Sequence, residues 1–171
     1  MKKNTGLFQY YVEGENEKKL INVLKTNMRL ITPGKVETLN VTQEKLSDMK
    51  LRTLKFGTIL VFVFDTDAGQ PTILNENIIK AKKSPNIKDV YCIPQVKNLE
   101  DELVRTMELK DIKELLNSNS SKDYKREMLR EKDENLKNKF ESHNFDIQKL
   151  WAKNPGIPYD MIPNNSDKIK L

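Results

Sequence analysis

Two aspartates that directly follow a strongly apolar run are the residues of this sequence best suited to chemistry. The run covers residues 58–64 and lies between Gly57 and Gly69. Asp65 and Asp67 follow it, separated by one residue. A short β-branched and aromatic run predicts a strand buried on both faces of a mostly parallel sheet, and ligands of such sheets bind outside the carboxyl ends of the strands. The two carboxylates project to the same side of an extended chain, where Mg²⁺ would relieve their repulsion. The alternative is a solvated turn that simply ends the strand.

A third carboxylate follows an earlier candidate strand. Residues 7–12 are apolar enough for a strand, and Glu13 and Gly14 come directly after them. If this strand lies beside the strand that ends at Asp65, parallel pairing brings Glu13 to the same edge of the sheet as Asp65 and Asp67. Three carboxylates that converge at one sheet edge are suited to Mg²⁺-dependent chemistry on phosphate.

The elements that must position these residues alternate along the first 95 residues. Strands are expected at 7–12, 36–41, 58–64 and 89–93, and helices at 18–25, 42–55 and 72–81, with Thr42 and Thr72 as N-caps. This alternation predicts an α/β, Rossmann-like core over residues 1–95, with a mostly parallel four-stranded sheet flanked by helices.

Residues 96–171 have a different character and are expected to form a helical extension packed on the core. Helices are predicted at 99–109 and 112–116, followed by one long charged helix at 122–141. Trp151 is expected to pack the tail, and the Pro- and Asn-rich end from residue 154 is expected to be irregular.

The composition favours a polyanionic partner and argues against several kinds of site. The chain has 171 residues with 30 basic and 25 acidic side chains, a formal net charge of +5 and a pI near 9.1. Cys92 and His143 are the sole cysteine and histidine, which excludes an internal disulfide and argues against a zinc site. No apolar run is long enough to cross a bilayer, so we expect a cytoplasmic protein without membrane contact.

The acidic motifs in this order resemble those of the Toprim domain, which topoisomerases, bacterial primases, small ribosomal-RNA maturases and the overcoming-lysogenization-defect nucleases share. The resemblance covers roughly residues 5–95. The residues that carry it are Tyr11-Val12-Glu13-Gly14, Gly34 in the middle turn, and Val63-Phe64-Asp65-Thr66-Asp67-Ala68-Gly69. It implies that Glu13 binds metal or acts as general acid or base, and that Asp65 and Asp67 bind Mg²⁺, with Mn²⁺ as a substitute.

Two features of the sequence indicate which members of the Toprim family it resembles most: it has no room for the extra domains of the larger members, and the residues after Asp67 differ from theirs. With this length and one cysteine, we expect neither the nucleophilic-tyrosine domain of a type IA topoisomerase nor the zinc module of a primase. After the second aspartate stands Gln70-Pro71-Thr72, where primases and topoisomerases commonly place charged residues. The resemblance therefore implies a small Mg²⁺-dependent nuclease acting on DNA or RNA, in phage defence or nucleic-acid processing.

Further acidic residues have two interpretations each. Glu100, ahead of Glu102, follows the fourth predicted strand and could be a further metal ligand, or it could be an ordinary acidic residue at a helix start. Glu15 and Glu17 could support the metal ligands, or they could interact with the helix dipole of the first turn.

Basic residues of the long charged helix are candidates for nucleic-acid binding. Lys122, Lys125 and Arg126 lie near its amino end and could contact phosphates. The alternative is a solvated helix face, because acidic residues are interleaved with them.

Two other functions stay open beside the nuclease. The first is a non-catalytic Toprim-like module that binds metal, nucleotide or a partner, with a second protein or a second copy as that partner. The second is a receiver-like domain in which Asp65 or Asp67 accepts a phosphoryl group, although the lysine expected after the last strand is lacking and only Lys97 is near.

Overall fold

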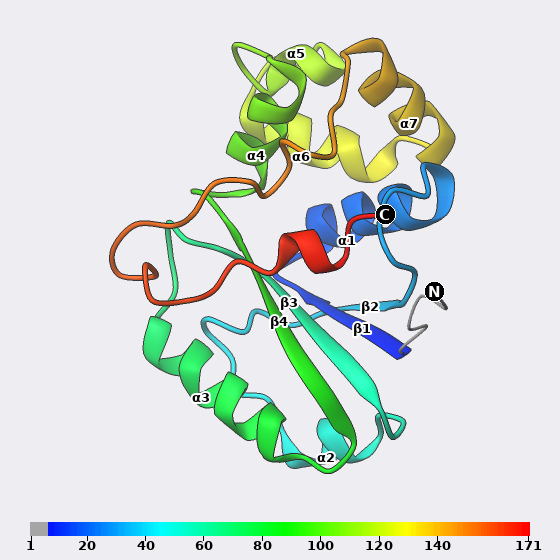
Figure 1. The fold of residues 1–171 in the computed structure, drawn as a ribbon. Helices are drawn as coiled ribbons and strands as arrows, with labels where there is room; N and C mark the ends of the chain where they lie inside the picture. Colours follow the sequence, from blue (N-terminus) through cyan, green and yellow to red (C-terminus); the bar gives the residue numbers. More distant parts are fainter. Residues whose placement is uncertain (1–6) are drawn as a thin grey trace.

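The computed structural model describes residues 7–171 and has an α/β fold in three layers (Figure 1). Its sheet has four parallel strands in the order β2-β1-β3-β4. The strands are β1 (Leu7–Val12), β2 (Lys35–Thr38), β3 (Thr58–Asp65) and β4 (Ile87–Gln95). The predicted α/β fold, with a parallel four-stranded sheet flanked by helices, is therefore confirmed. The first six residues of the predicted 1–95 core lie outside the described residues.

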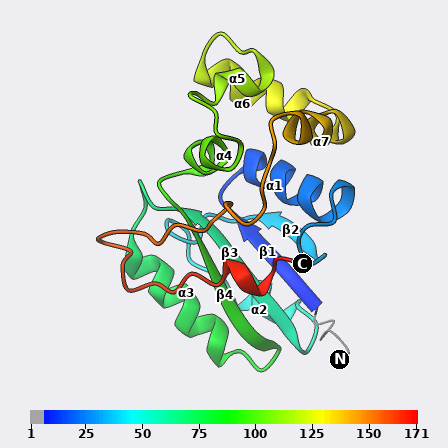
Figure 2. The same cartoon turned by 45° about the horizontal axis from the view of Figure 1, so that its top comes forward.

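Helices cover both faces of the sheet. One face carries α1 (Glu15–Asn22) with its π-helical continuation η1 (Val23–Asn27), and also α4 (Leu99–Met107), α5 (Lys113–Leu116), α6 (Ser121–Arg130) and α7 (Asp133–Ser142). The other face carries α2 (Asp48–Arg52) and α3 (Pro71–Lys83). Figure 2 shows α4 beside α1, and α5, α6 and α7 beyond them, away from the sheet. No helix within residues 7–171 is both long enough and apolar enough to cross a membrane.

Successive side chains of β3 point to opposite faces of the sheet, and both sets are buried. Val61 and Val63 pack among the residues of α1 and α4, whereas Leu60 and Phe62 pack against α2 and α3. Because successive strand residues face opposite layers, both layers need apolar partners, and the run is apolar throughout. The C-terminal helices contribute residues to the first of these clusters.

The predicted helix 42–55 is wrong, because only α2 is helical there. The backbone of the preceding loop is bound by a side chain from α3: Asn77 donates to the carbonyls of Val41 (2.9 Å) and Glu44 (2.8 Å) and accepts from Leu46 N–H (2.8 Å). These bonds replace helical ones. Ser47, rather than Thr42, is the N-cap of the short helix that follows.

The predicted long helix 122–141 is also wrong, because it is divided into α6 and α7. Glu131 and Lys132 adopt extended backbone angles between the two helices. Lys19 of α1 donates to the Glu131 carbonyl and pairs with Asp133 at 2.7 Å. The bend turns Leu136 and Phe140 of α7 into the core.

Smaller differences concern the ends of elements. α3 begins at Pro71 with Gln70 as N-cap, so Thr72 lies inside the helix and does not cap it. Proline is suited to the first helical position, since it has no N–H to satisfy and its φ is already helical. β2 is shorter and β4 longer than predicted.

The tail after α7 is irregular, as predicted, but it is fixed to the sheet. Asn165 exchanges two hydrogen bonds with the backbone of Cys92 in β4, at 2.8 and 2.9 Å. Lys170 forms an isolated antiparallel bridge with Ile31. In Figure 1 the orange and red tail passes the carboxyl ends of the strands and then runs along the sheet.

Candidate functional site

The two acidic motifs meet at the carboxyl edge of the sheet. β1 and β3 are adjacent and parallel, with Val12 paired to Val63. Glu13 follows β1 directly, and its Oε2 accepts a hydrogen bond of 3.1 Å from the backbone N–H of Asp65. The predicted juxtaposition of Glu13 with the end of β3 is therefore present.

Each aspartate is held through one of its two oxygens. Gln95 at the end of β4 donates from Nε2 to Oδ1 of Asp65 at 2.7 Å. Asn98, the N-cap of α4, donates from Nδ2 to Oδ2 of Asp67 at 3.0 Å. Within the described chain, Asp65 Oδ2, Asp67 Oδ1 and Glu13 Oε1 take part in no hydrogen bond. Each carboxylate therefore keeps one oxygen for a ligand.

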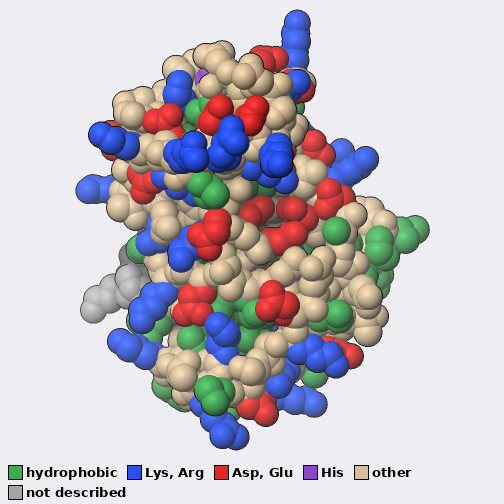
Figure 3. Space-filling view, turned by 180° about the vertical axis from the view of Figure 1, so that it is seen from behind, with side chains coloured by type: hydrophobic (Ala, Val, Ile, Leu, Met, Phe, Trp, Pro, Cys, Tyr) green, Lys and Arg blue, Asp and Glu red, His purple; other side chains and the backbone are tan. Residues whose placement is uncertain are grey.

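We use the term acidic cluster for the carboxylates that influence one another at this edge: Glu13, Glu17, Asp65, Asp67 and Glu100. Burial, followed by the charges of Glu13 and Glu17, raises the pKa of Asp65 to about 8. Burial also raises the pKa of Glu13, and Asp67 and Glu100 add to this rise. Figure 3 shows acidic side chains gathered near the middle of one face, with basic side chains above them. Crowding of this kind favours either protonation or a bound cation.

The predicted accessory residues divide into those near the cluster and those outside it. Glu100 lies near it and pairs with Lys125 at 3.5 Å. The charge of Lys125 lowers the pKa of Glu13, so this lysine also lies near the acidic cluster. Arg126 pairs instead with Asp123 at 2.7 Å, and Lys122 is exposed at the start of α6.

The chemistry of the cluster fits a hard divalent cation, because carboxylate and amide oxygens are its preferred ligands. As they stand, no three Asp, Glu, His or Cys side chains in the part of the chain described are arranged to hold an ion. Binding an ion would therefore require changes of side-chain torsion.

Three site residues were missed by the sequence prediction. Gln95 and Asn98 follow β4, which neighbours β3, so the rule that placed Glu13 could have found them. Tyr159 has no such signal, because it comes from the distant tail. Its hydroxyl donates to the Ala68 carbonyl at 2.8 Å, and its ring packs 5.8 Å from that of Phe64.

Two glycines that contribute to the Toprim resemblance, Gly34 and Gly69, have structural causes. A Cβ on Gly34 would come within 2.5 Å of the Phe8 carbonyl, so this glycine permits close approach of β1 and the start of β2, far from the cluster. Gly69 has a φ of +76°, and a Cβ there would come within 2.1 Å of Thr42 Oγ1. The turn after Asp67 therefore requires glycine.

We expect Gly69→Ala to lower the free energy of unfolding by about 3 kcal/mol, since it combines a left-handed backbone with a clash. Two controls separate these causes. Gly57 has a φ of +84°, but a Cβ there would contact no other atom, so Gly57→Ala is expected to lower the free energy of unfolding by about 1 kcal/mol. Gly156→Ala meets neither and should stay within about 0.5 kcal/mol of the parent. Urea denaturation measures all three, and equal losses for Gly69 and Gly57 would contradict the clash.

The raised pKa of Asp65 predicts a pH dependence of stability in the metal-free protein. Its folded pKa of about 8 lies above the ordinary 3.8, so between these values the folded state holds a proton that the unfolded state releases. Stability should therefore fall as pH rises from about 4 to 8. Because water reaches the half-buried side chain, we expect a loss of about 2 kcal/mol, smaller than the full shift implies. Asp65→Asn should flatten this loss in urea titrations with EDTA, and parallel pH profiles would contradict it.

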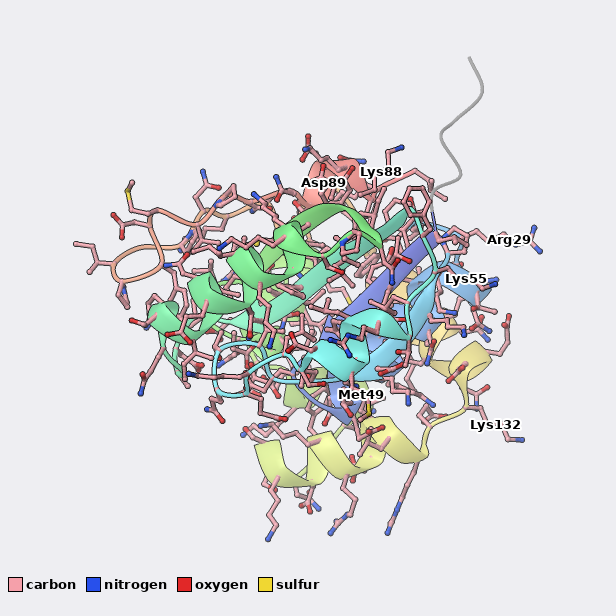
Figure 4. The ribbon with its side chains drawn as sticks, turned by 90° about the horizontal axis from the view of Figure 1, so that it is seen from below. Arg29, Met49, Lys55, Lys88, Asp89 and Lys132 are labelled. Carbon is pink, nitrogen blue, oxygen red and sulfur yellow. The ribbon has the colours of Figure 1, made fainter. Side chains whose placement is uncertain are left out.

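A cavity of about 580 Å³ lies at the opposite end of the sheet, with Leu7, Pro33 and Leu54 in its wall. Lys55 lines it too, and in Figure 4 this residue lies on the same side of the molecule as Arg29. Its lining offers no group of carboxylates comparable to the acidic cluster among the residues described. We therefore place the candidate site at the carboxyl edge.

Comparison of the chain with protein-family models, curated proteins and solved structures gives no match. The resemblance to Toprim domains thus rests on the motif residues quoted above, and function is argued from the acidic cluster.

Proposed function

We propose that this chain is a Mg²⁺-dependent phosphodiesterase of DNA or RNA, with a Toprim-like core. The observation that carries the proposal is the meeting of Glu13 and Asp65, from adjacent parallel strands, at the carboxyl edge of the sheet. Burial and mutual repulsion raise the pKa of Asp65 to about 8 in the absence of a cation. Mg²⁺ prefers such oxygens and keeps waters that phosphate oxygens can replace.

The proposed roles follow from the oxygens that the protein leaves available. Asp65, Asp67 and Glu13 would hold the ion, with Glu100 as a further ligand. When bound, Mg²⁺ would stabilise negative charge on the phosphate oxygens and lower the pKa of a bound water. If Glu13 does not bind the ion, it would instead accept a proton from the attacking water through Oε1, since its raised pKa brings its proton affinity closer to neutral pH.

Lys125 would bind the backbone of the substrate beside the scissile phosphate. It lies close enough to the cluster to pair with Glu100 and to influence Glu13. Lys122 and Arg126 on the same helix would extend this contact along the nucleic-acid strand. The formal net charge of +5 agrees with a polyanionic substrate. The substrate that we propose is nucleic acid of the cytoplasm.

We expect Lys125→Ala to raise the KM for nucleic acid about fivefold and to reduce the salt dependence of binding by about one phosphate contact. Lys55→Ala is the control, because it removes the same charge at the opposite end of the sheet. Initial rates and filter binding at several salt concentrations measure both effects. If KM and the salt dependence change equally in the two variants, Lys125 contributes only through the net charge of the protein and makes no specific contact with the substrate.

A non-catalytic module that binds nucleotide, nucleic acid or a partner is the second candidate. It is favoured by the hydrogen bonds that already occupy one oxygen of each aspartate. The two candidates are separated by incubation with single- and double-stranded DNA and RNA in Mg²⁺, Mn²⁺ or EDTA. Cleavage that needs the divalent cation supports the nuclease, whereas binding in EDTA without turnover in any metal supports the module.

A further inference from the structure

Trp151 in the C-terminal tail is fully buried, and its polar groups are all bonded. Its backbone N–H donates to Oε2 of Glu102 at 2.9 Å, and its carbonyl accepts from Asn164 at 2.7 Å and from the Ser166 hydroxyl at 3.1 Å. Its indole Nε1–H donates to Oε1 of Gln95 at 3.2 Å. The residue has a φ of +56°, a conformation that side-chain-bearing residues avoid. These bonds hold it there.

Gln95 connects this tryptophan to the acidic cluster. Its side chain is fully buried at the end of β4 and donates from Nε2 to Oδ1 of Asp65 at 2.7 Å. An indole N–H is only a donor, so the amide must present its oxygen to Trp151 and its NH₂ to Asp65. A flipped amide would place NH₂ against the indole N–H and oxygen against the carboxylate. The indole therefore fixes the direction of the amide.

The hydrogen bond from this amide occupies one of the two oxygens of Asp65. Oδ1 is taken by Gln95, and Oδ2 has no hydrogen bond among the described residues. We propose that Trp151 and Gln95 are positioning residues, through which the tail sets Asp65 with Oδ2 free for the cation. This inference rests on the proposed function, because it assigns a cation to Asp65.

The experiment compares two variants that each break one bond of this path. Trp151→Phe keeps a ring and removes the N–H, and Gln95→Met keeps the length of the side chain and removes the amide. Ser166→Ala is the matched control, because it removes a hydrogen bond of the same tryptophan outside the path to Asp65. The readouts are Mn²⁺ affinity, by electron paramagnetic resonance, and hydrogen exchange of the Gln95 side-chain amide by NMR.

We expect Trp151→Phe and Gln95→Met each to weaken Mn²⁺ binding about tenfold, with no further loss in the double variant. Trp151→Phe should also lower the exchange protection of the Gln95 amide, because its NH₂ is then no longer fixed toward Asp65, whereas Ser166→Ala should change neither readout. Unchanged protection in Trp151→Phe, or Mn²⁺ affinity within twofold of the parent in folded Gln95→Met, overturns the inference. If the parent protein binds no Mn²⁺, the proposed function fails, and the amide exchange still decides whether Trp151 orients Gln95.

Discussion

Asp65→Asn is expected to lower metal-dependent cleavage of nucleic acid about 1,000-fold, equivalent to roughly 4 kcal/mol of transition-state stabilisation. The amide oxygen can still accept the hydrogen bond from Gln95, so the local structure is kept while the charge for the cation is lost. The loss should appear in kcat/KM at saturating Mg²⁺.

The control for this variant is Asp89→Asn. Asp89 lies in the amino-terminal half of β4, and Figure 4 shows it beside Lys88. The substitution removes the same charge from the same sheet and should leave cleavage within about twofold of the parent. Cleavage at the parent rate in Asp65→Asn would show that Asp65 has no role in the reaction.

The largest effect on stability is expected for Glu102→Ala, a loss of about 4 kcal/mol in the free energy of unfolding. Glu102 is fully buried, and its Oε1 accepts from Val96 N–H at 2.9 Å and from Arg105 at 2.7 Å. Its Oε2 accepts from Trp151 N–H at 2.9 Å. Truncation leaves the N–H groups of Val96 and Trp151 buried without partners and opens a cavity where β4, α4 and the tail join.

Urea denaturation of the full chain measures this loss, with Glu141→Ala as the control. Glu141 is exposed on α7, so its truncation should cost less than about 0.5 kcal/mol. A cost for Glu102→Ala within 1 kcal/mol of the control would mean that water replaces the carboxylate and that the junction is not closed.

The sheet and the central pair of the site could be predicted from local patterns. The run before Asp65 is apolar on both faces, and the alternation of strands with helices requires parallel pairing. Parallel pairing brings the ends of neighbouring strands to one edge, so Glu13 had to lie near Asp65 once β1 and β3 were neighbours.

The remaining contacts depend on chain segments that are far apart in sequence. Asn77 binds a loop more than thirty residues earlier and thereby shortens the helix that the pattern of residues 42–55 predicts. Trp151 reaches Gln95 across a separation of 56 residues. No periodicity or motif encodes such pairs, because each is selected by packing in the folded chain.

Glu17 shows how a local explanation can hide a tertiary one. A glutamate in the first turn of a helix is favoured by the dipole, which explains its presence without any site. In the fold it is buried, and the charges of Glu13 and Glu100 raise its pKa together with burial. Its membership of the acidic cluster follows from the position of α1 beside α4 and α6, which the sequence pattern does not specify.

The most direct test is a crystal of the parent protein soaked in Mn²⁺, with anomalous differences collected near the manganese edge. We expect an anomalous peak bounded by the carboxylates of Glu13, Asp65 and Asp67, and no such peak in a crystal of Asp65→Asn. Absence of a peak at this edge of the sheet, at Mn²⁺ concentrations that support cleavage, would contradict a cation site formed by these three residues.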